Sequence, residues 1–178
     1  MIVSHVGFAV PSCQSAWFWL LARLVFPVFG VIAASNFLGA EDSAAYLSKL
    51  LPVALMAEPA FYLLTGNFGN IVLQIWLGFA FVWWGNPLFA IAACFCEFGP
   101  AGLAAIVIWC CASKSWRFAG GVVSNALPFG WVSGIGSILP GLTVKAPPFP
   151  FRLHNVFRVG YVGHLYALLA LKTWIPQT

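Results

Sequence analysis

The stretch that decides the fold runs from residue 17 to residue 29 and reads WFWLLARLVFPVF. Apart from Arg23 and Pro27, all of its residues are aromatic or aliphatic. Such a run is typical of a helix inside a lipid bilayer, where an arginine costs from about 3 to more than about 10 kcal/mol. A charge retained at that cost indicates a functional site, so Arg23 is the first candidate residue.

His5 is a second ionisable residue inside apolar sequence. It lies in the short run from Met1 to Val10, and residues 11–15 connect that run to the next. His5 and Arg23 both lie about two helical turns from this connection, so we expect them at a similar depth in the bilayer. The sequence therefore predicts that the two side chains meet.

Composition excludes a soluble domain. Of the 178 residues 62% are hydrophobic and only 7% are charged, whereas soluble domains carry about 25% charged residues. The formal charge of +4 comes from eight Lys and Arg, which are too scattered to form a nucleic-acid surface. The five cysteines show no spacing of a zinc site or a disulfide framework, so we expect no metal site.

The predicted fold is all-α, a polytopic transmembrane helical bundle that forms one domain over residues 1–178. Most apolar runs approach the length that crosses the hydrocarbon core, which gives about eight or nine membrane segments. The first is too short to span before Pro11, so we expect a truncated first helix and a start site assigned too far downstream. The expected segments are 1–11, 16–38, 46–65, 70–84, 88–96, 101–112, the two halves of 118–143, and 156–174.

Basic residues in the loops predict the orientation, because cytoplasmic loops are rich in Lys and Arg. The turns at 11–15, 66–69 and 96–100 would then share the opposite, non-cytoplasmic face. The loop residues expected in the cytoplasm are Lys49, Lys114, Arg117, Lys145, Arg152 and Arg158.

Polar residues inside the apolar segments lie near that non-cytoplasmic face. His5, Arg23, Glu58, Asn70 and Glu97 each fall within about two helical turns of it. Charges in lipid persist by pairing with one another or by lining a wet cavity. The sequence therefore predicts that these residues converge in one half of the bundle.

A series of short motifs accompanies these polar residues. They are His5-Val6-Gly7, ARLVFPVF at 22–29, Asn36-Phe37, EPAFYL at 58–63, GNIVL at 69–73, EFGPAGL at 97–103, and Gly163-His164-Leu165 within an aromatic-rich segment at 157–166. In order and spacing they resemble the TraX-type conjugal transfer proteins, across essentially the whole chain. The TrbP proteins of broad-host-range plasmids belong to the same group. The chain departs from the family at Ser4, where Asp usually precedes the first histidine.

The resemblance implies a function. TraX proteins are described as acetylating the N-terminus of the pilin subunit during maturation of the conjugative pilus. They are similar to membrane acyltransferases that place a His and an Arg in their first two helices. The implied protein is an acetyltransferase of the bacterial inner (cytoplasmic) membrane, with acetyl-CoA as acyl donor and with pilin and the lipid bilayer as partners.

Four residues are the expected catalytic set. His5 suits a general base, because an imidazole takes up a proton near neutral pH. Arg23 suits the stabilisation of oxyanion charge or the binding of donor phosphates; its alternative role is a salt bridge between helices. Glu58 and Glu97 would support the base or act as counter-ions of Arg23.

Asn70, Tyr161 and His164 are the candidate substrate-binding residues. Asn70 follows a glycine-rich turn and starts an apolar segment, so helix capping is its alternative role. His164 lies within the last segment near Tyr161, and an interhelical hydrogen bond is its alternative role.

Three other functions remain open from the sequence. A non-enzymatic assembly factor would hold pilin in the membrane through the same polar groups. An acetyltransferase could act on a glycan or a lipid instead of pilin. A small-solute transporter is a weaker alternative, because the chain lacks the two-fold repeat of most secondary carriers.

Overall fold

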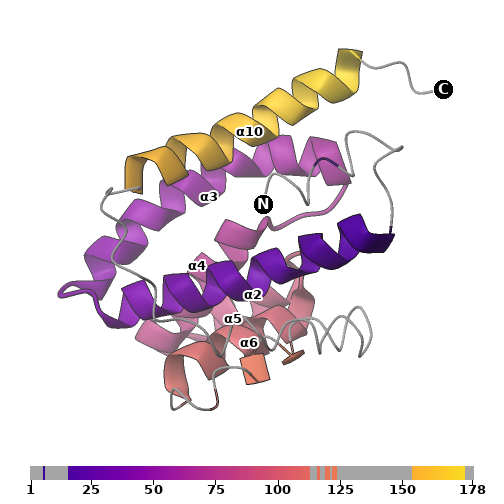
Figure 1. Ribbon diagram of the computed structural model, residues 1–178. Coiled ribbons are helices and arrows are strands. Elements are labelled where there is room, and N and C mark those ends of the chain that lie inside the picture. The colour runs from indigo at the N-terminus through magenta and orange to yellow at the C-terminus, as the bar shows by residue number, and fades with distance from the viewer. Residues whose placement is uncertain are drawn as a thin grey trace.

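Six helices make up most of the part of the chain that the computed structural model describes (Figure 1). That part comprises residues 6, 16–112, 116, 119, 120, 122, 123 and 154–174, with side chains described outside 16–25 and 154–158. The predicted segments 118–143 and 1–11 lie almost wholly outside it. The helices are α2 (Ala16–Leu38), α3 (Ser43–Thr65), α4 (Ile71–Trp84), α5 (Pro87–Cys94), α6 (Gly99–Cys111) and α10 (His154–Trp174).

The all-α prediction is confirmed for the described residues, and the helices match the predicted segments to within a few residues. The largest difference is the start of α3, at Ser43 instead of 46. Asp42 caps this end, since its carboxylate accepts the N–H of Ala45 at 2.9 Å. Gly66 ends α3 in the left-handed region at φ 74° and donates its N–H to the carbonyl of Tyr62.

Two of the predicted crossings are short helices. Asn86 caps α5, and Pro87 begins it at a position where a missing N–H has no cost. With eight residues, α5 is about 12 Å long, well below the roughly 30 Å of a hydrocarbon core. α6 has 13 residues, or about 20 Å. Neither helix crosses a bilayer of that thickness unaided.

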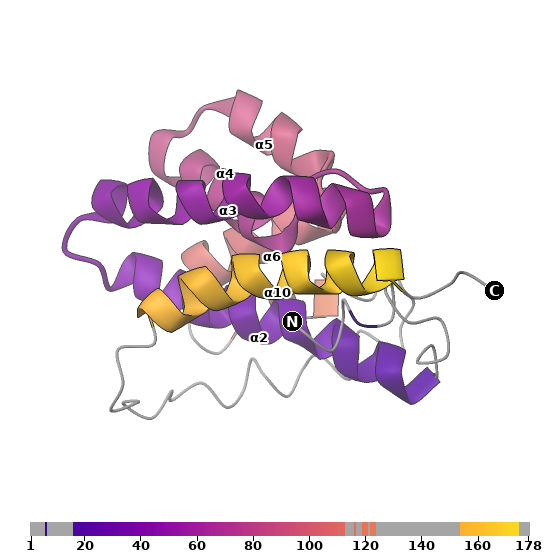
Figure 2. The same cartoon turned by 90° about the horizontal axis from the view of Figure 1, so that it is seen from above.

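α4 is the central helix. It contacts α3, α5, α6 and α2, while α10 packs along α3 and α2 packs along α6 (Figures 1 and 2). Consistent with this position, nearly all of its side chains from Ile71 to Ala80 are buried. The two polar residues of this region, Asn70 before α4 and Gln74 within it, are therefore inside the protein.

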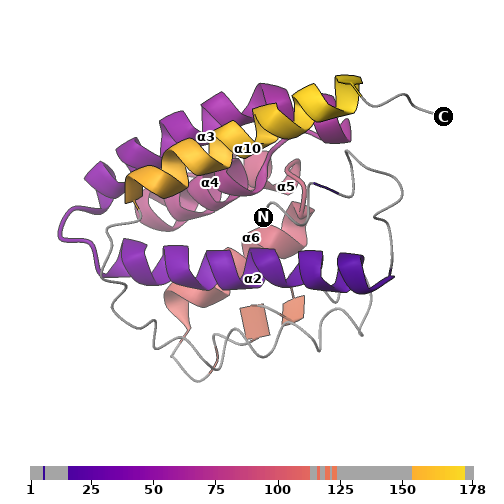
Figure 3. The ribbon, with the colours of Figure 1, turned by 45° about the horizontal axis from the view of Figure 1, so that its top comes forward.

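α3 and α10 run in the same direction (Figure 3). The hydroxyl of Tyr166 donates to the carbonyl of Met56 at 3.3 Å, and Lys172 Nζ donates to the carbonyl of Leu64 at 2.8 Å. Residue numbers thus rise together along the pair. The end of α10 lies beside the end of α3, next to the turn that leads into α4.

The turns before α4 and before α6 lie against each other. The N–H of Glu97 donates to the carbonyl of Gly69 at 3.0 Å. Gly69 has φ 79°, and a Cβ on it would come within 2.5 Å of Cys96 Cα. The turns at 66–69 and 96–100 therefore share one end of the molecule, as the sequence predicted.

One described helix is long and apolar enough to cross a membrane, namely α3. Three shorter apolar helices accompany it, at Phe26–Leu38, Ile71–Trp84 and Gly99–Cys111. A single such helix is weak support, because core helices of soluble proteins have the same length and composition. The bundle of about eight or nine segments stays a prediction from the length of the apolar runs.

Candidate functional site

Glu58 of α3 holds the turn that precedes α4. Its Oε1 accepts the N–H of Gly69 at 2.7 Å, and its Oε2 accepts the N–H of Asn70 at 3.0 Å. Asn70 Nδ2 also donates to Oε2, at 2.6 Å. Both carboxylate oxygens are therefore engaged with the Gly69-Asn70 turn, and the side chain is half-buried.

α3 offers backbone carbonyls to α4 near each of its two prolines. A proline cannot donate to the carbonyl four residues before it, which in α3 is that of Ser48 or Leu55. Asn70 Nδ2 donates to the carbonyl of Ala54 at 2.9 Å, five residues before Pro59. Two helical turns earlier, Trp76 Nε1 donates to the carbonyl of Leu47 at 3.0 Å, five residues before Pro52. The prolines thus accompany two links between α3 and α4.

Asn70 is the N-cap of α4, so the capping alternative is confirmed. Its Oδ1 accepts the N–H groups of Val72 at 2.9 Å and Leu73 at 3.1 Å. The Tyr161 hydroxyl donates to the same oxygen at 3.4 Å. The side chain is fully buried, and its amide bonds to the protein itself. This geometry gives Asn70 a structural role at the junction of α3, α4 and α10, and its role in substrate binding stays a prediction.

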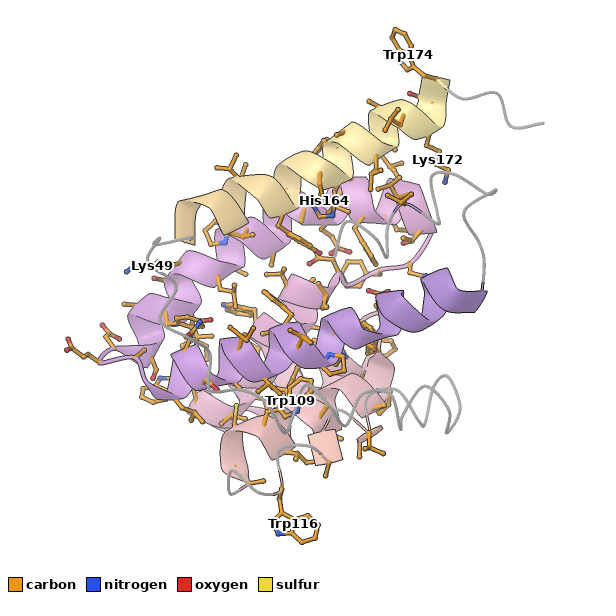
Figure 4. The ribbon with its side chains drawn as sticks, in the orientation of Figure 1. Lys49, Trp109, Trp116, His164, Lys172 and Trp174 are labelled. Carbon is orange, nitrogen blue, oxygen red and sulfur yellow. The ribbon has the colours of Figure 1, made fainter. Side chains whose placement is uncertain are left out.

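Tyr161 and His164 lie one turn apart on α10. Tyr161 is 2% exposed, and its ring centroid lies 5.3 Å from that of His164. His164 is half-buried, with Nδ1 3.0 Å from the carbonyl of Gly160, within its own helix (Figure 4). The structure thus joins Tyr161 to Asn70 and leaves His164 beside Tyr161.

Glu97 lies in the turn between α5 and α6, half-buried. The carboxylates of Glu97 and Glu58 both lie within electrostatic range of the Tyr161 hydroxyl. The two residues also meet at Gly69, whose carbonyl accepts the N–H of Glu97 and whose N–H donates to Glu58. Glu58, Asn70, Glu97 and Tyr161 therefore form one cluster, which we call the acidic cluster.

Arg23 lies on α2, but its side chain is outside the described residues, as is His5. The inward face of α2 can still be followed in the buried residues Phe26, Gly30, Ala33 and Phe37. Position 23 precedes Phe26 by three residues, or about one helical turn. The Phe26 ring stacks on Phe98 with centroids 4.0 Å apart, and Phe98 follows Glu97. The register therefore places Arg23 one turn from the contact beside Glu97.

A family model described as "TraX protein" matches residues 1–114, well over half of the chain. The chain belongs to the TraX family. Membership implies a pilin-related role in conjugative transfer. No curated protein and no solved structure matches the chain. The family match includes Glu58, Asn70 and Glu97, whereas Tyr161 and His164 on α10 lie beyond it.

Gln74 is the polar residue of this TraX-family chain that the sequence analysis missed. It is fully buried in α4, whose sequence IVLQIWLGFAFVWW is otherwise apolar. Its amide bonds to the backbone of the turn that carries Glu97. A single amide in an otherwise apolar helix of 14 residues is the signal that could have found it, because a buried amide requires bonding partners.

Metal-ligand chemistry has no candidate in the described part of the chain. No group of three or more His, Cys, Asp or Glu there has the geometry to hold a metal ion. The acidic cluster instead combines two carboxylates, an amide and a phenol, which suit hydrogen bonding and the binding of a cation.

Proposed function

We propose that this TraX-family protein is a multi-pass protein of the bacterial inner membrane that acetylates the N-terminus of a conjugative pilin subunit, with acetyl-CoA as donor. Family membership supports the link to conjugation and pilin. The composition, with 62% hydrophobic and 7% charged residues, supports the membrane location.

The observation that carries the proposal is the convergence of polar groups from four parts of the chain. Glu58 comes from α3, Asn70 begins α4, Glu97 precedes α6, and Tyr161 comes from α10. Ionisable groups in apolar surroundings mark functional sites more often than structural ones. A cluster assembled from four elements is the arrangement expected of a site in a bundle.

The chemistry assigned to the site is acyl transfer to an amine. His5 takes the proton that the amine loses as the new C–N bond forms, and returns it to the sulfur as the thioester C–S bond breaks. Arg23 stabilises the negative charge that develops on the carbonyl oxygen. The donor supplies the activated acetyl group and leaves as a free thiol.

The acidic cluster fits the acceptor better than the donor. The carboxylate of Glu97 favours an N-terminal ammonium and takes one proton from it, which leaves the neutral amine that attacks, whereas the donor carries phosphates that need cationic partners. Arg23 is the residue we assign to the donor side. Glu58, whose oxygens bond to the Gly69-Asn70 turn, is assigned to holding the site together, and Glu97 to the acceptor.

The test is the mass of pilin purified from cells that carry variant chains. With the wild-type chain we expect pilin heavier by one acetyl group, placed on its first residue. His5→Ala and Glu97→Gln should each yield mainly unmodified pilin, with the membrane protein present at normal level. Asn86→Ala is the matched control, because Asn86 is an exposed cap of α5 that follows the C-terminal end of α4, whereas Asn70 precedes its N-terminal end. It should leave acetylation unchanged.

Each result decides a separate claim. Full acetylation with His5→Ala would remove His5 from the mechanism. Unmodified pilin in cells with the wild-type chain, when the protein is present in the membrane, would contradict the acetyltransferase.

A non-enzymatic assembly factor is the second candidate function. The bonds of Glu58 and Asn70 to the protein's own backbone favour it, because they show that part of the acidic cluster serves the fold. This function predicts that pilin co-purifies with the chain and carries no added mass. Pilin that is released once acetylated would argue against it.

A further inference from the structure

Gln74 directs all of its side-chain hydrogen bonds to one turn. Its Oε1 accepts the N–H of Phe98 at 3.0 Å. Its Nε2 donates to the carbonyl of Gly99 at 2.9 Å and, at 3.4 Å, to that of Ala93. These partners lie at both ends of the turn between α5 and α6. The amide therefore brackets this turn, in the sense that it bonds to the backbone on both sides of it.

The packing around the amide is close. Gly102 of α6 lies against it, and a Cβ at that position would come within 2.7 Å of Gln74 Cδ. A buried amide is costly unless its donors and acceptor are bonded, whereas an apolar side chain of similar size carries no such requirement. The amide is therefore best explained by the bonds that it makes.

The bracketed turn carries Glu97, which is also held from its other side. The N–H of Glu97 donates to the carbonyl of Gly69, and Glu58 accepts the N–H of Gly69. Gln74 in turn follows Asn70 by one turn of α4, with its N–H donating to the Asn70 carbonyl at 3.0 Å. The backbone of Glu97 is thus fixed by two points of the same helix start.

We infer that Gln74 is a positioning residue, which sets the place of the Glu97 carboxylate relative to Glu58 and Tyr161 by bracketing the turn at 93–99. The inference rests on the proposed acetyl transfer. Gln74 acts through Glu97 and is not assigned a contact with substrate.

The experiment compares Gln74→Met, which keeps the volume without the bonds, with Trp76→Phe. Trp76→Phe is the matched control, because it also removes a bond from α4 to a backbone carbonyl, but that bond goes to Leu47 of α3. The full chain is purified and assayed with a pilin N-terminal peptide and acetyl-CoA. We expect Gln74→Met to lower kcat roughly tenfold or more, since small displacements of a catalytic group have effects of that size. KM for both substrates should stay within about twofold, and Trp76→Phe should leave kcat and KM unchanged.

Gln74→Glu tests the hydrogen bonds of residue 74 through the pH dependence of kcat. A role in filling space alone would not change that dependence. A protonated carboxyl at position 74 still accepts from the N–H of Phe98 and donates to the carbonyl of Gly99. An ionised carboxylate would instead face two carbonyl oxygens. We therefore expect the kcat of Gln74→Glu, relative to wild type, to rise as the pH falls. A pH profile parallel to wild type would overturn the inference, and this comparison applies even where Gln74→Met does not fold.

The labelling rate of the Cys96 thiol measures how closely the turn between α5 and α6 is packed, and this measurement does not depend on acetyl transfer. Its thiol is buried against Gly69, so maleimide labelling of the folded wild-type chain should be slow. We expect faster labelling of Cys96 in Gln74→Met and no change in Trp76→Phe, as read by mass spectrometry.

The outcomes separate the inference from the proposed function. A folded Gln74→Met chain with unchanged kcat would overturn the positioning role, whether or not Cys96 labels faster. If the wild-type chain transfers no acetyl group, the proposed function fails. Cys96 labelling then decides alone whether Gln74 holds the turn.

Discussion

Gly69 shows how much of the site depends on one residue without a side chain. Its N–H bonds to Glu58, its carbonyl accepts from Glu97, and its Cα lies against Cys96. The left-handed φ of 79° disfavours any residue with a Cβ. Both glutamates of the acidic cluster are therefore tied to Gly69, Glu58 through its carboxylate and Glu97 through its backbone N–H.

Gly66 and Gly69 form a matched pair for substitution. Both have left-handed φ, but a Cβ on Gly66 would meet nothing within 4 Å, whereas one on Gly69 would meet the backbone of Cys96. We expect Gly66→Ala to cost about 1–2 kcal/mol from backbone strain alone. Gly69→Ala should cost on the order of 3 kcal/mol more, because the Cys96 backbone must move.

Thermal unfolding in detergent, followed by tryptophan fluorescence, measures the difference. Equal midpoints for the two alanine variants would show that the turns before α4 and α6 do not touch.

At the scale of the elements, helix limits could be read from the sequence because their signals are local. Gly66, Asn70, Asn86 and Pro87 end or begin helices close to the predicted positions. The partners of each polar residue depend on tertiary packing, and no pattern along the chain states them. The sequence predicts Glu58 as a support for the base or a counter-ion of Arg23, but it does not predict the bonds of Glu58 to the turn before α4.

The start of α4 should respond unusually to the change Asn70→Asp. Aspartate is normally as good an N-cap as asparagine. Here the change removes the donors to Ala54 and Glu58 and sets one carboxylate against another. We expect a loss on the order of 2–5 kcal/mol in the free energy of unfolding.

Asn86→Asp is the control, because Asn86 also caps a helix but is exposed; we expect a change below about 0.5 kcal/mol. Adding Glu58→Gln to Asn70→Asp should restore part of the loss, since the new amide can donate to the new carboxylate. Urea unfolding in detergent measures all four chains. Equal losses for Asn70→Asp and Asn86→Asp would contradict the contact between Glu58 and Asn70.

Glu58→Gln alone is expected to destabilise the chain by about 1–3 kcal/mol, because an NH₂ group then faces donors of the Gly69-Asn70 turn. Glu41→Gln, at an exposed loop position, should have no measurable effect. The same unfolding assay compares them. If Glu58→Gln leaves the free energy of unfolding unchanged, the carboxylate is not needed for the fold and is free for a direct role in catalysis.

At the scale of the whole molecule, the two ends of the bundle differ. The turns at 66–69 and 95–98 and the end of α10 lie together, and the acidic cluster lies beside them. The loop at 39–42 lies at the other end of α3 (Figure 1). The sequence predicted which turns share a face, because loop charge and span order are global signals. With nine crossings it also implies that α3 and α10, the third and the last, run in the same direction. It could not predict that these two helices are neighbours, since that depends on how the surfaces pack.

Labelling of single cysteines tests this orientation. Asn67→Cys and Glu41→Cys both introduce thiols at exposed loop positions. With a maleimide that does not cross the inner membrane, we expect Asn67→Cys to react in intact cells. Glu41→Cys should react only after the inner membrane is opened. Reaction of both from the outside would contradict a membrane crossing by α3, and the parent chain gives the background from native cysteines.

The two hydrogen bonds from α4 to backbone carbonyls of α3 bear on how this protein tolerates mutation. Both acceptors are main-chain carbonyls, at Leu47 and Ala54, and every amino acid supplies one. Substitutions at those two positions keep the acceptors, so losing either bond requires a change at its donor, Asn70 or Trp76. The exposed positions of α3 can therefore change while the attachment of α4 is preserved.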